Sequence, residues 1–314
     1  MASETYVHNG TAFKNANNIY VNVSGTFQGV DEAYANVGGT YKLVFSSFQA
    51  TSFVTLSTGT GTFTVPENAN AIHIKSAVAG GGGAARGGNA DGSASGESAG
   101  AGGGSGAYIS DTVFIVAGNE TLTYSVGVGG APGDDGSNAD STAGDGTVTT
   151  LTASVTGSLF SLGGGGGSSG TGSDSTTLRT NTAGSAGAAT VSSGRYSSGT
   201  FRDSTGLAKL LTTLTTGPTG NFNDSGNGAQ GNLTGTGNCS GSGCRISGFG
   251  GAPSFAGNIA GGSAGTSSGS GTNGGDGSRG SGAGGGAAQV DSTGETLGGT
   301  GGAGEMVYRF MRVA

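Results

Sequence analysis

Residues 161–170 read SLGGGGGSSG, and this stretch decides what kind of fold the chain can form. Its five consecutive glycines have no side chains to bury, so a hydrophobic core of the usual kind cannot form there. Glycine also loses more backbone freedom on ordering than any other residue, which makes such a run costly to hold in one conformation. Similar glycine-rich runs recur along the chain at residues 80–83, 102–104, 284–286 and 298–302.

Two interpretations of these runs are open. The first is a flexible glycine/serine linker or a disordered segment. The second is a set of extended polyglycine-II helices, which resemble polyproline II, with three residues per turn and a rise of about 3.1 Å per residue. These helices make no internal hydrogen bonds, so each buried N–H and C=O group needs a partner on a neighbouring helix. Only glycine lets the backbones approach closely enough for such a lattice.

Strand-like segments directly flank the glycine runs and favour the ordered interpretation. Ile72, Ile74 and Val78 fall on one face of a strand. His73 and Lys75 fall on the other face, and the stretch LTYSVGV repeats the same alternation. Because tethers rarely alternate with well-formed strands, we predict a mainly β fold with extended polyglycine-II helices. In this fold a β framework carries a glycine-helix bundle with apical loops.

The composition limits the function. Of 314 residues, 73 are glycine and 10% are charged, whereas average proteins have about 7% glycine and about 25% charged residues. The net charge of −7 argues against nucleic acid or an anionic membrane as the main partner. No apolar stretch approaches the length of a membrane span. The N-terminal sequence MASETYVHNG does not look like a secretory signal, so we expect synthesis in the cytoplasm.

A 14-residue repeat marks the N-terminal region as a separate module, residues 1–47. It reads YVHNGTAF, YVNVSGTF and YANVGGTY, with turn-forming dipeptides such as Ser24-Gly25 and Gly38-Gly39 at its centre. We predict three hairpins that pack their aromatic residues together, and a plain antiparallel meander is the alternative. The aromatic residues of this expected attachment module are Tyr6, Phe13, Tyr20, Phe27, Tyr34 and Tyr41.

Residues 48–314 form the second expected domain. Within it we predict a hairpin of residues 108–116 and 121–128, a short helix at 206–214, and a final strand that pairs back onto the early strands. Met306, Tyr308 and Phe310 would share one face of that final strand. Residues 173–247 are rich in Ser, Thr and Asn and are expected to form a variable loop region.

The order of these segments resembles a known family. FTVPENANAIHIKSAVAGGGG is followed by GGGSGAYISDTVFIVAGNETLTYSVGVGG, by DGTVTTLT and by later glycine runs. This succession is similar to the glycine-rich domain of bacteriophage tail-fibre and adhesin proteins. The N-terminal repeat IYVNVSGTF is similar to the aromatic/glycine repeats of phage tail proteins.

The resemblance implies a virion protein at the tail tip or tail fibre, in which a sandwich of glycine helices displays loops to a receptor on the bacterial surface. Its expected partners are a surface glycan or outer-membrane protein and other tail proteins, with a trimeric fibre as one form of assembly. Arginines and aromatics of the loop region suit such binding, because they fork onto anions or stack on sugar rings. These candidates are Arg195, Tyr196, Phe201, Arg202, Phe222 and Arg245.

Little in the sequence points to catalysis, and we expect no enzymatic activity, no cofactor and no metal. His8 and His73 are too isolated for a hydrolase triad, and His73 is expected to be an ordinary surface residue. The aspartates of one polar segment lack EF-hand spacing, so a solvated turn is favoured over a calcium site. They are Asp134, Asp135, Asp140 and Asp145.

Cys239 and Cys244 are the two cysteines of the chain, and two states are open for them. They are either free thiols or a small loop-closing disulfide formed after release from a reducing cell. A zinc site would need more ligands than the neighbouring sequence supplies.

Three other functions compete with the adhesin. A structural tail or capsid decoration protein would lack a receptor. An ice-binding protein would need a flat, regular face of threonines, and the loops here look too irregular. A glycan depolymerase would need a pair of carboxylates in a cleft, and the sequence offers no convincing pair.

Overall fold

The structure of the protein is a computed structural model. It describes residues 6–8, 13–15, 19–30, 32–46, 48–85, 101–133, 141–170, 181–192, 200–202, 208–210, 224–226, 262, 274–280 and 297–313. Within these residues the fold is mainly β, as predicted, and it has several antiparallel sheets and no helix. No helix in this part of the chain could therefore span a membrane.

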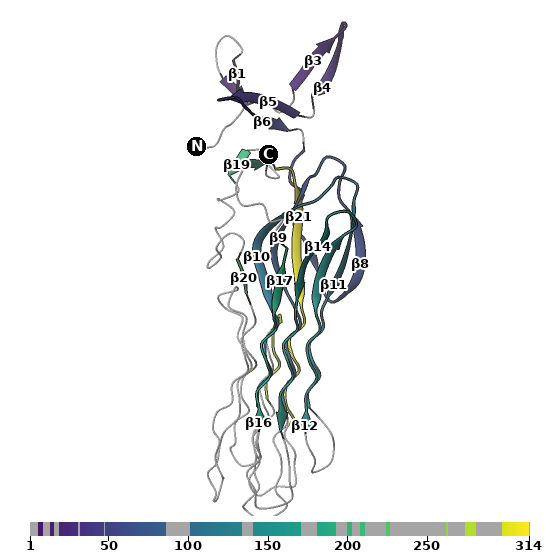
Figure 1. Ribbon diagram of the computed structural model, residues 1–314, viewed down its shortest axis with the longest axis vertical. Coiled ribbons are helices and arrows are strands. Elements are labelled where there is room, and N and C mark those ends of the chain that lie inside the picture. The colour runs from purple at the N-terminus through teal and green to yellow at the C-terminus, as the bar shows by residue number, and fades with distance from the viewer. Residues whose placement is uncertain are drawn as a thin grey trace, which may run out of the picture.

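Two five-stranded sheets form the centre of the molecule (Figure 1). The strands of the first sheet, in spatial order, are β20 (Asp224–Gly226), β10 (Tyr108–Ile115), β9 (Ala71–Val78), β21 (Glu305–Met311) and β7 (Val54–Leu56). Those of the second sheet are β17 (Ala189–Val191), β14 (Gly157–Leu162), β13 (Thr149–Ala153), β11 (Thr121–Val126) and β8 (Gly59–Thr64).

The two sheets bury a common hydrophobic core. Strands β9, β10 and β21 contribute residues from the first sheet, and β11, β13 and β14 contribute residues from the second. The rings of Phe63 and Tyr308 stack at 4.5 Å, which joins the sheets across the core. The prediction for the final strand is confirmed, because β21 pairs with both β9 and β7. Its three core residues are Met306, Tyr308 and Phe310.

The hairpin predicted for residues 108–116 and 121–128 is wrong. β10 pairs with β9 in the first sheet, whereas β11 pairs with β8 and β13 in the second. Between them Asn119 adopts a positive φ of 62°, and its amide donates to the Val65 carbonyl. The connection is thus a crossover between sheets, which lets both strands bury an apolar face in the one core.

Glycine-rich segments continue directly from the strands. Figure 1 shows them running side by side away from the two sheets, as long undulating chains. They comprise residues 79–85, 101–107, 127–133, 143–148, 163–168, 183–188, 274–280 and 297–304. Although they contain few large side chains, residues 79–85 and 101–107 are buried throughout.

Backbone hydrogen bonds hold these segments with a period of three residues. Along residues 79–84, three successive amides donate to three different neighbouring segments, and the next three amides repeat the same order, over N···O distances of 2.8 to 3.1 Å. The amides of Ala79 and Gly82 donate to segment 101–107, those of Gly80 and Gly83 to 143–148, and those of Gly81 and Ala84 to 297–304. These described segments are therefore ordered, and the linker interpretation is wrong for them.

Close approach of backbones explains the glycines. A Cβ atom added at Gly165 would overlap the carbonyl of Gly104, and one added at Gly82 would overlap the carbonyl of Gly166. No side chain fits at such positions without moving a neighbouring segment. The predicted run at 284–286 lies outside the described residues.

The N-terminal repeats form three separate hairpins, as predicted. They are β1 (Tyr6–His8) with β2 (Phe13–Asn15), β3 (Ile19–Val23) with β4 (Thr26–Val30), and β5 (Glu32–Val37) with β6 (Thr40–Ser46). The central turn residues have positive φ: 54° and 88° at Ser24 and Gly25, and 63° and 85° at Gly38 and Gly39. The hairpins lie at the end of the molecule opposite the glycine segments (Figure 1).

The expected packing of the repeat aromatics fails where their side chains are described. Phe27 is 72% exposed and Tyr34 is 53% exposed. Each hairpin is a two-stranded sheet of its own among the described strands. The repeat predicts the local turns, but the exposure of Phe27 and Tyr34 does not fit a shared aromatic core.

The helix predicted at 206–214 is also contradicted. Residues Ala208–Leu210 are strand β19, which pairs with β18 (Thr200–Arg202). A nine-residue apolar pattern is too short to stabilise a helix without tertiary packing, because helix nucleation is costly. One further small sheet joins β12 (Ser141–Thr142), β15 (Ser169–Gly170) and β16 (Asn181–Thr182).

Candidate functional site

The end of the glycine segments farthest from the sandwich is the first candidate site. Segment 79–85 leaves β9 and segment 101–107 returns to β10 antiparallel to it, so both chains are fixed where their connection begins and ends. Strands β12 and β16 lie at this far end (Figure 1). The connections 86–100, 134–140 and 171–180 are outside the described residues. Their anchor points therefore rest on a hydrogen-bonded frame.

Buried hydroxyl groups complete the frame at both ends of segment 79–85. Ser168 Oγ accepts from the Ala85 amide at 2.7 Å and donates to the Ala101 carbonyl at 2.6 Å. At the sandwich end, Thr149 Oγ1 accepts from the Gly127 amide and donates to the Val78 carbonyl, both at 3.0 Å. Each hydroxyl links an amide and a carbonyl that stand three residues beyond a directly bonded pair, so it takes the place of the next backbone hydrogen bond in the series.

Aspartates satisfy amides at the outer surface of the lattice. Asp145 Oδ1 accepts from the Gly167 amide and Asp276 Oδ1 accepts from the Thr300 amide, both at 2.7 Å. Each carboxylate takes the place of a further neighbouring segment. This is the role found for Asp145, one of the aspartates of the predicted solvated turn. Asp134, Asp135 and Asp140 lie outside the described residues.

Most of the predicted receptor-binding residues lie outside the described residues. Phe201 and Arg202 are in strand β18, and the positions of their side chains are not described. The described residues therefore do not test whether these candidates lie together, and their role stays a prediction. Those outside the description are Arg195, Tyr196, Phe222 and Arg245, and the same holds for Cys239 and Cys244.

The proposed loop region 173–247 contains part of the frame. Within it, amides of residues 183–188 donate to carbonyls of segment 101–107, and carbonyls of 183–188 accept from amides of segment 163–168. Residues Ala189–Val191 then form β17 at the edge of the second sheet. Composition did not separate these residues from their neighbours, because alanine, serine and glycine occur in both. A receptor-binding loop in this region has to lie outside 181–192.

The attachment-module aromatics occupy equivalent positions in the three hairpins. Phe27 is opposite Asn22, and Tyr41 is opposite Asn36. Each asparagine Oδ1 accepts a hydrogen bond from the amide of the second turn residue, Gly25 at 2.8 Å for Asn22 and Gly39 at 2.9 Å for Asn36. Phe13 is opposite His8 in the first hairpin. The strands also contain Tyr6, Tyr20 and Tyr34, one in each hairpin.

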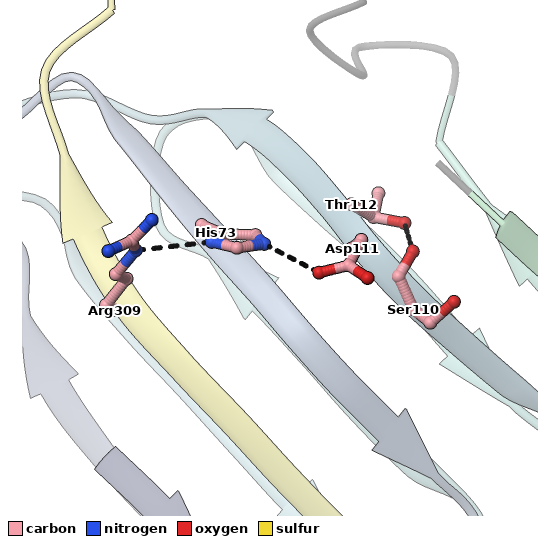
Figure 2. A network of polar contacts seen from close by, with 5 residues as sticks. All are labelled: His73, Ser110, Asp111, Thr112 and Arg309. Atoms are coloured by element: carbon pink, nitrogen blue, oxygen red, sulfur yellow. Dashed lines mark hydrogen bonds and ion pairs between the residues drawn. The ribbon is translucent and has the colours of Figure 1, made fainter. Parts of the chain in front are cut away.

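A buried polar network on the first sheet is a second candidate site, and the sequence did not predict it. His73 Nε2 lies 3.4 Å from Asp111 Oδ1, and Arg309 Nε donates to His73 Nδ1 at 3.3 Å. Figure 2 shows the three side chains in a row across β10, β9 and β21. The Thr112 hydroxyl donates to the Ser110 carbonyl at 2.9 Å, spanning Asp111.

The central strands are irregular beside this network. The register of β9 with β21 shifts between Val307 and Tyr308, which leaves Lys75 as an extra residue. On β10, Asp111 adopts a positive φ of 42°, which is uncommon for a residue with a side chain. Such bulges redirect side chains and often occur next to functional residues. The alternation used in the sequence analysis cannot predict this.

His73 is 1% exposed, so the expectation of an ordinary surface residue is wrong. It does point away from the inter-sheet core, but Phe53 lies over the network, with its ring 5.4 Å from His73 and 4.6 Å from the Arg309 guanidinium. Burial is the largest cause that lowers the pKa of His73 below its ordinary value of 6.5, and Arg309 lowers it further against the opposing effect of Asp111.

The donors and acceptors fix the protonation of this network. Arginine donates only, so Nδ1 of His73 carries no proton and Nε2–H donates to Asp111. Both ring nitrogens are engaged, and the ring is buried. His73 thus has no free nitrogen to take a proton from a nucleophile, which is what a catalytic base in a triad requires.

Comparison with known proteins identifies the family of the glycine-rich region. No curated protein sequence matches this chain. Residues 55–311 match the family described as glycine-rich domain, and this range includes the two sheets and the glycine segments. Because the match covers well over half of the chain, the protein belongs to the glycine-rich domain family.

Proposed function

We propose that this protein is a phage virion adhesin at the tail tip. In this proposal the N-terminal hairpins attach it to the tail, and loops at the far end of the glycine segments bind a receptor on the bacterial surface. The observation that carries the proposal is the arrangement of the frame. A rigid backbone lattice holds the anchor points of several connections at one end, and rigid scaffolds that present loops are typical of binding proteins.

We further propose that the glycine segments are polyglycine-II helices packed as a sandwich. The three-residue period of their hydrogen bonds supports this, because polyglycine II has three residues per turn and directs successive amides to different neighbours. The close contact between their backbones also supports this proposal, because added Cβ atoms would overlap neighbouring carbonyls.

The second hairpin suits attachment because two of its apolar side chains are exposed. Val23 is 47% exposed and Phe27 is 72% exposed, on a two-stranded sheet. An isolated two-stranded hairpin is marginally stable in water, so a partner surface that covers it would stabilise it. A neighbouring tail protein would provide that surface in an assembled particle.

Adsorption of purified protein or virions to host cells tests the receptor-binding half of the proposal. Tyr196→Ala and Arg202→Ala are expected to reduce adsorption and leave the melting temperature nearly unchanged. Thr190→Ala is the control, because Thr190 is exposed on β17 and belongs to the frame. Lower stability with intact adsorption would contradict the proposed role of Tyr196 and Arg202.

Incorporation into particles tests the attachment half. Phe27→Ala is expected to reduce incorporation, and the control Val155→Ala, at a position 76% exposed on the sandwich, is not. If attachment depends on Phe27 and no loop variant changes adsorption, the protein is a structural tail or capsid decoration protein. If the two variants incorporate equally, this hairpin is not the attachment site.

A further inference from the structure

The segment that joins the hairpins to the sandwich runs along the edge of the first sheet beside β21 and ends in edge strand β7. We call residues 48–56 the connector. The Thr51 amide donates to the Phe310 carbonyl at 3.0 Å, and the Phe310 amide donates to Thr51 Oγ1 at 2.9 Å. Ala50 is buried in a small apolar cluster with Ala71, Val113, Met311 and Val313.

Phe53 couples the connector to the buried polar network. Its ring is packed against the Arg309 guanidinium, at 4.6 Å, and against the edge of His73, at 5.4 Å. The Lys75 ammonium lies 5.2 Å from the same ring. The connector therefore docks on a surface whose charge depends on the protonation of His73.

We infer that the connector is a pH-sensitive clasp, docked while His73 is neutral and released when His73 takes up a proton. In the neutral state Nδ1 accepts the Arg309 Nε–H bond. A proton on Nδ1 would place two donors face to face, and arginine cannot give up its proton. Arg309 then has to withdraw from the ring, which removes the surface on which Phe53 packs.

The charges around His73 support this direction. Among the described residues, Arg309 on β21 and Lys75 on β9 disfavour a proton on His73, whereas Asp111 on β10 favours one. Burial also disfavours a proton on His73 and is the largest of these effects. The pKa of His73 is therefore lower in the docked state than in an opened one. A lower pKa in the docked state means that protons favour the open state.

The connector is the element that should yield first. Strands β9, β10 and β21 are the three inner strands of the sheet, whereas β7 is an edge strand of three residues. Although Phe48 and Leu56 pack against the inter-sheet core, an edge segment that pairs on one side only opens locally at a lower free energy than the inner strands. The N-terminal hairpins would then move relative to the glycine-rich domain in acid. The clasp does not depend on the adhesin proposal.

Hydrogen exchange of the full-length chain, corrected for the intrinsic pH dependence of exchange, tests the clasp. The opening constant of residues 48–56 should rise about tenfold per pH unit below 6.5, until His73 is protonated in the docked state as well. The lattice residues 79–85 serve as an internal reference that stays unchanged. Equal protection of the connector across this range would overturn the inference.

Two variants separate His73 from other acidic effects. In His73→Gln the amide oxygen can accept from Arg309 and the amide nitrogen can donate to Asp111, without titrating, so the connector should stay protected in acid. His8→Gln, which removes the other histidine, should respond like the unmodified chain. An unchanged acid response in His73→Gln would overturn the inference.

A titration of the histidine ring resonances provides the same test without a variant at the site. The protonation of His73 should occur below pH 6.5 and should coincide with faster exchange of the connector amides. His73 titrating at 6.5, with connector protection unaffected, would overturn the inference.

Discussion

The β-sandwich and the glycine segments belong to the same chain and share strand directions, yet different interactions hold them together. In the sandwich, side chains such as Phe114 and Phe160 fill the space between two sheets, with ring centroids 6.0 Å apart. In the glycine segments, hydrogen bonds between the amides and carbonyls of neighbouring backbones hold the interior together. A core of side chains tolerates some change in shape, whereas a core of backbones tolerates no added atom where the segments touch.

The comparison predicts that the largest loss comes from emptying the side-chain core. Phe114→Ala should lower the free energy of unfolding by about 3–5 kcal/mol, because it removes a fully buried ring and leaves a cavity. Denaturant unfolding measures the loss. Ile115→Ala on the same strand is the control, because Ile115 is 39% exposed and should cost much less. Equal losses would show that the sandwich core is not the main side-chain contribution.

Adding one methyl group should destabilise the lattice most where the backbones of two segments already touch. Gly165→Ala should lower the free energy of unfolding by about 1–3 kcal/mol, because its Cβ would overlap the Gly104 carbonyl. Gly144→Ala is the graded comparison within the lattice and should lose less, since its Cβ would be in tight contact with the Ala131 nitrogen, at 3.0 Å, but would not overlap a carbonyl. If Gly165→Ala were as stable as the unmodified chain, the segments could not be packed backbone to backbone.

The next largest loss of stability is expected from removing a buried hydroxyl, that of Thr149, at the junction of the sandwich and the glycine segments. Thr149→Val keeps the shape but leaves the Gly127 amide and the Val78 carbonyl without a partner, at a cost of about 1–2 kcal/mol. Thr149→Ser retains the hydroxyl and should recover most of the loss. Similar melting temperatures for the two variants would mean that the bridge contributes nothing.

The smallest effect is expected at the lattice surface. Asp145→Ala removes the acceptor of the exposed Gly167 amide, which water can replace, so we expect a loss of about 0.5–1 kcal/mol. Asp145→Asn keeps an acceptor oxygen and should lose less. A loss at Asp145 larger than that at Thr149 would reverse the ranking of buried and exposed bridges.

The sequence predicted well what side chains encode locally. The alternation in EMVYRFM placed Met306, Tyr308 and Phe310 in the core, and the turn dipeptides placed the N-terminal hairpins. It mispaired β10 and β11, because a turn signal such as Gly118-Asn119 is the same whether the chain turns back or changes sheet. The partners of each glycine segment were also unpredictable, since glycine has no side chain to specify register.

The site was harder to predict than the fold. His73 looked exposed because its strand alternates, and its burial depends on Phe53, Asp111 and Arg309 from distant parts of the chain. The direction of Asp111 follows from its positive φ, which no sequence pattern indicated. The receptor-binding candidates, among them Tyr196, stay predictions, because they rest on composition and resemblance.

Hydrogen exchange of the amides of residues 79–85 tests the central claim most directly, because these residues have almost no side chains to protect them. If a three-residue hydrogen-bond lattice holds the segment, the amides that pair with segments 101–107, 143–148 and 297–304 should all be strongly protected. Their protection should approach that of the core strand β9. Exchange at the rate of an unstructured glycine peptide, while β9 stays protected, would contradict the lattice.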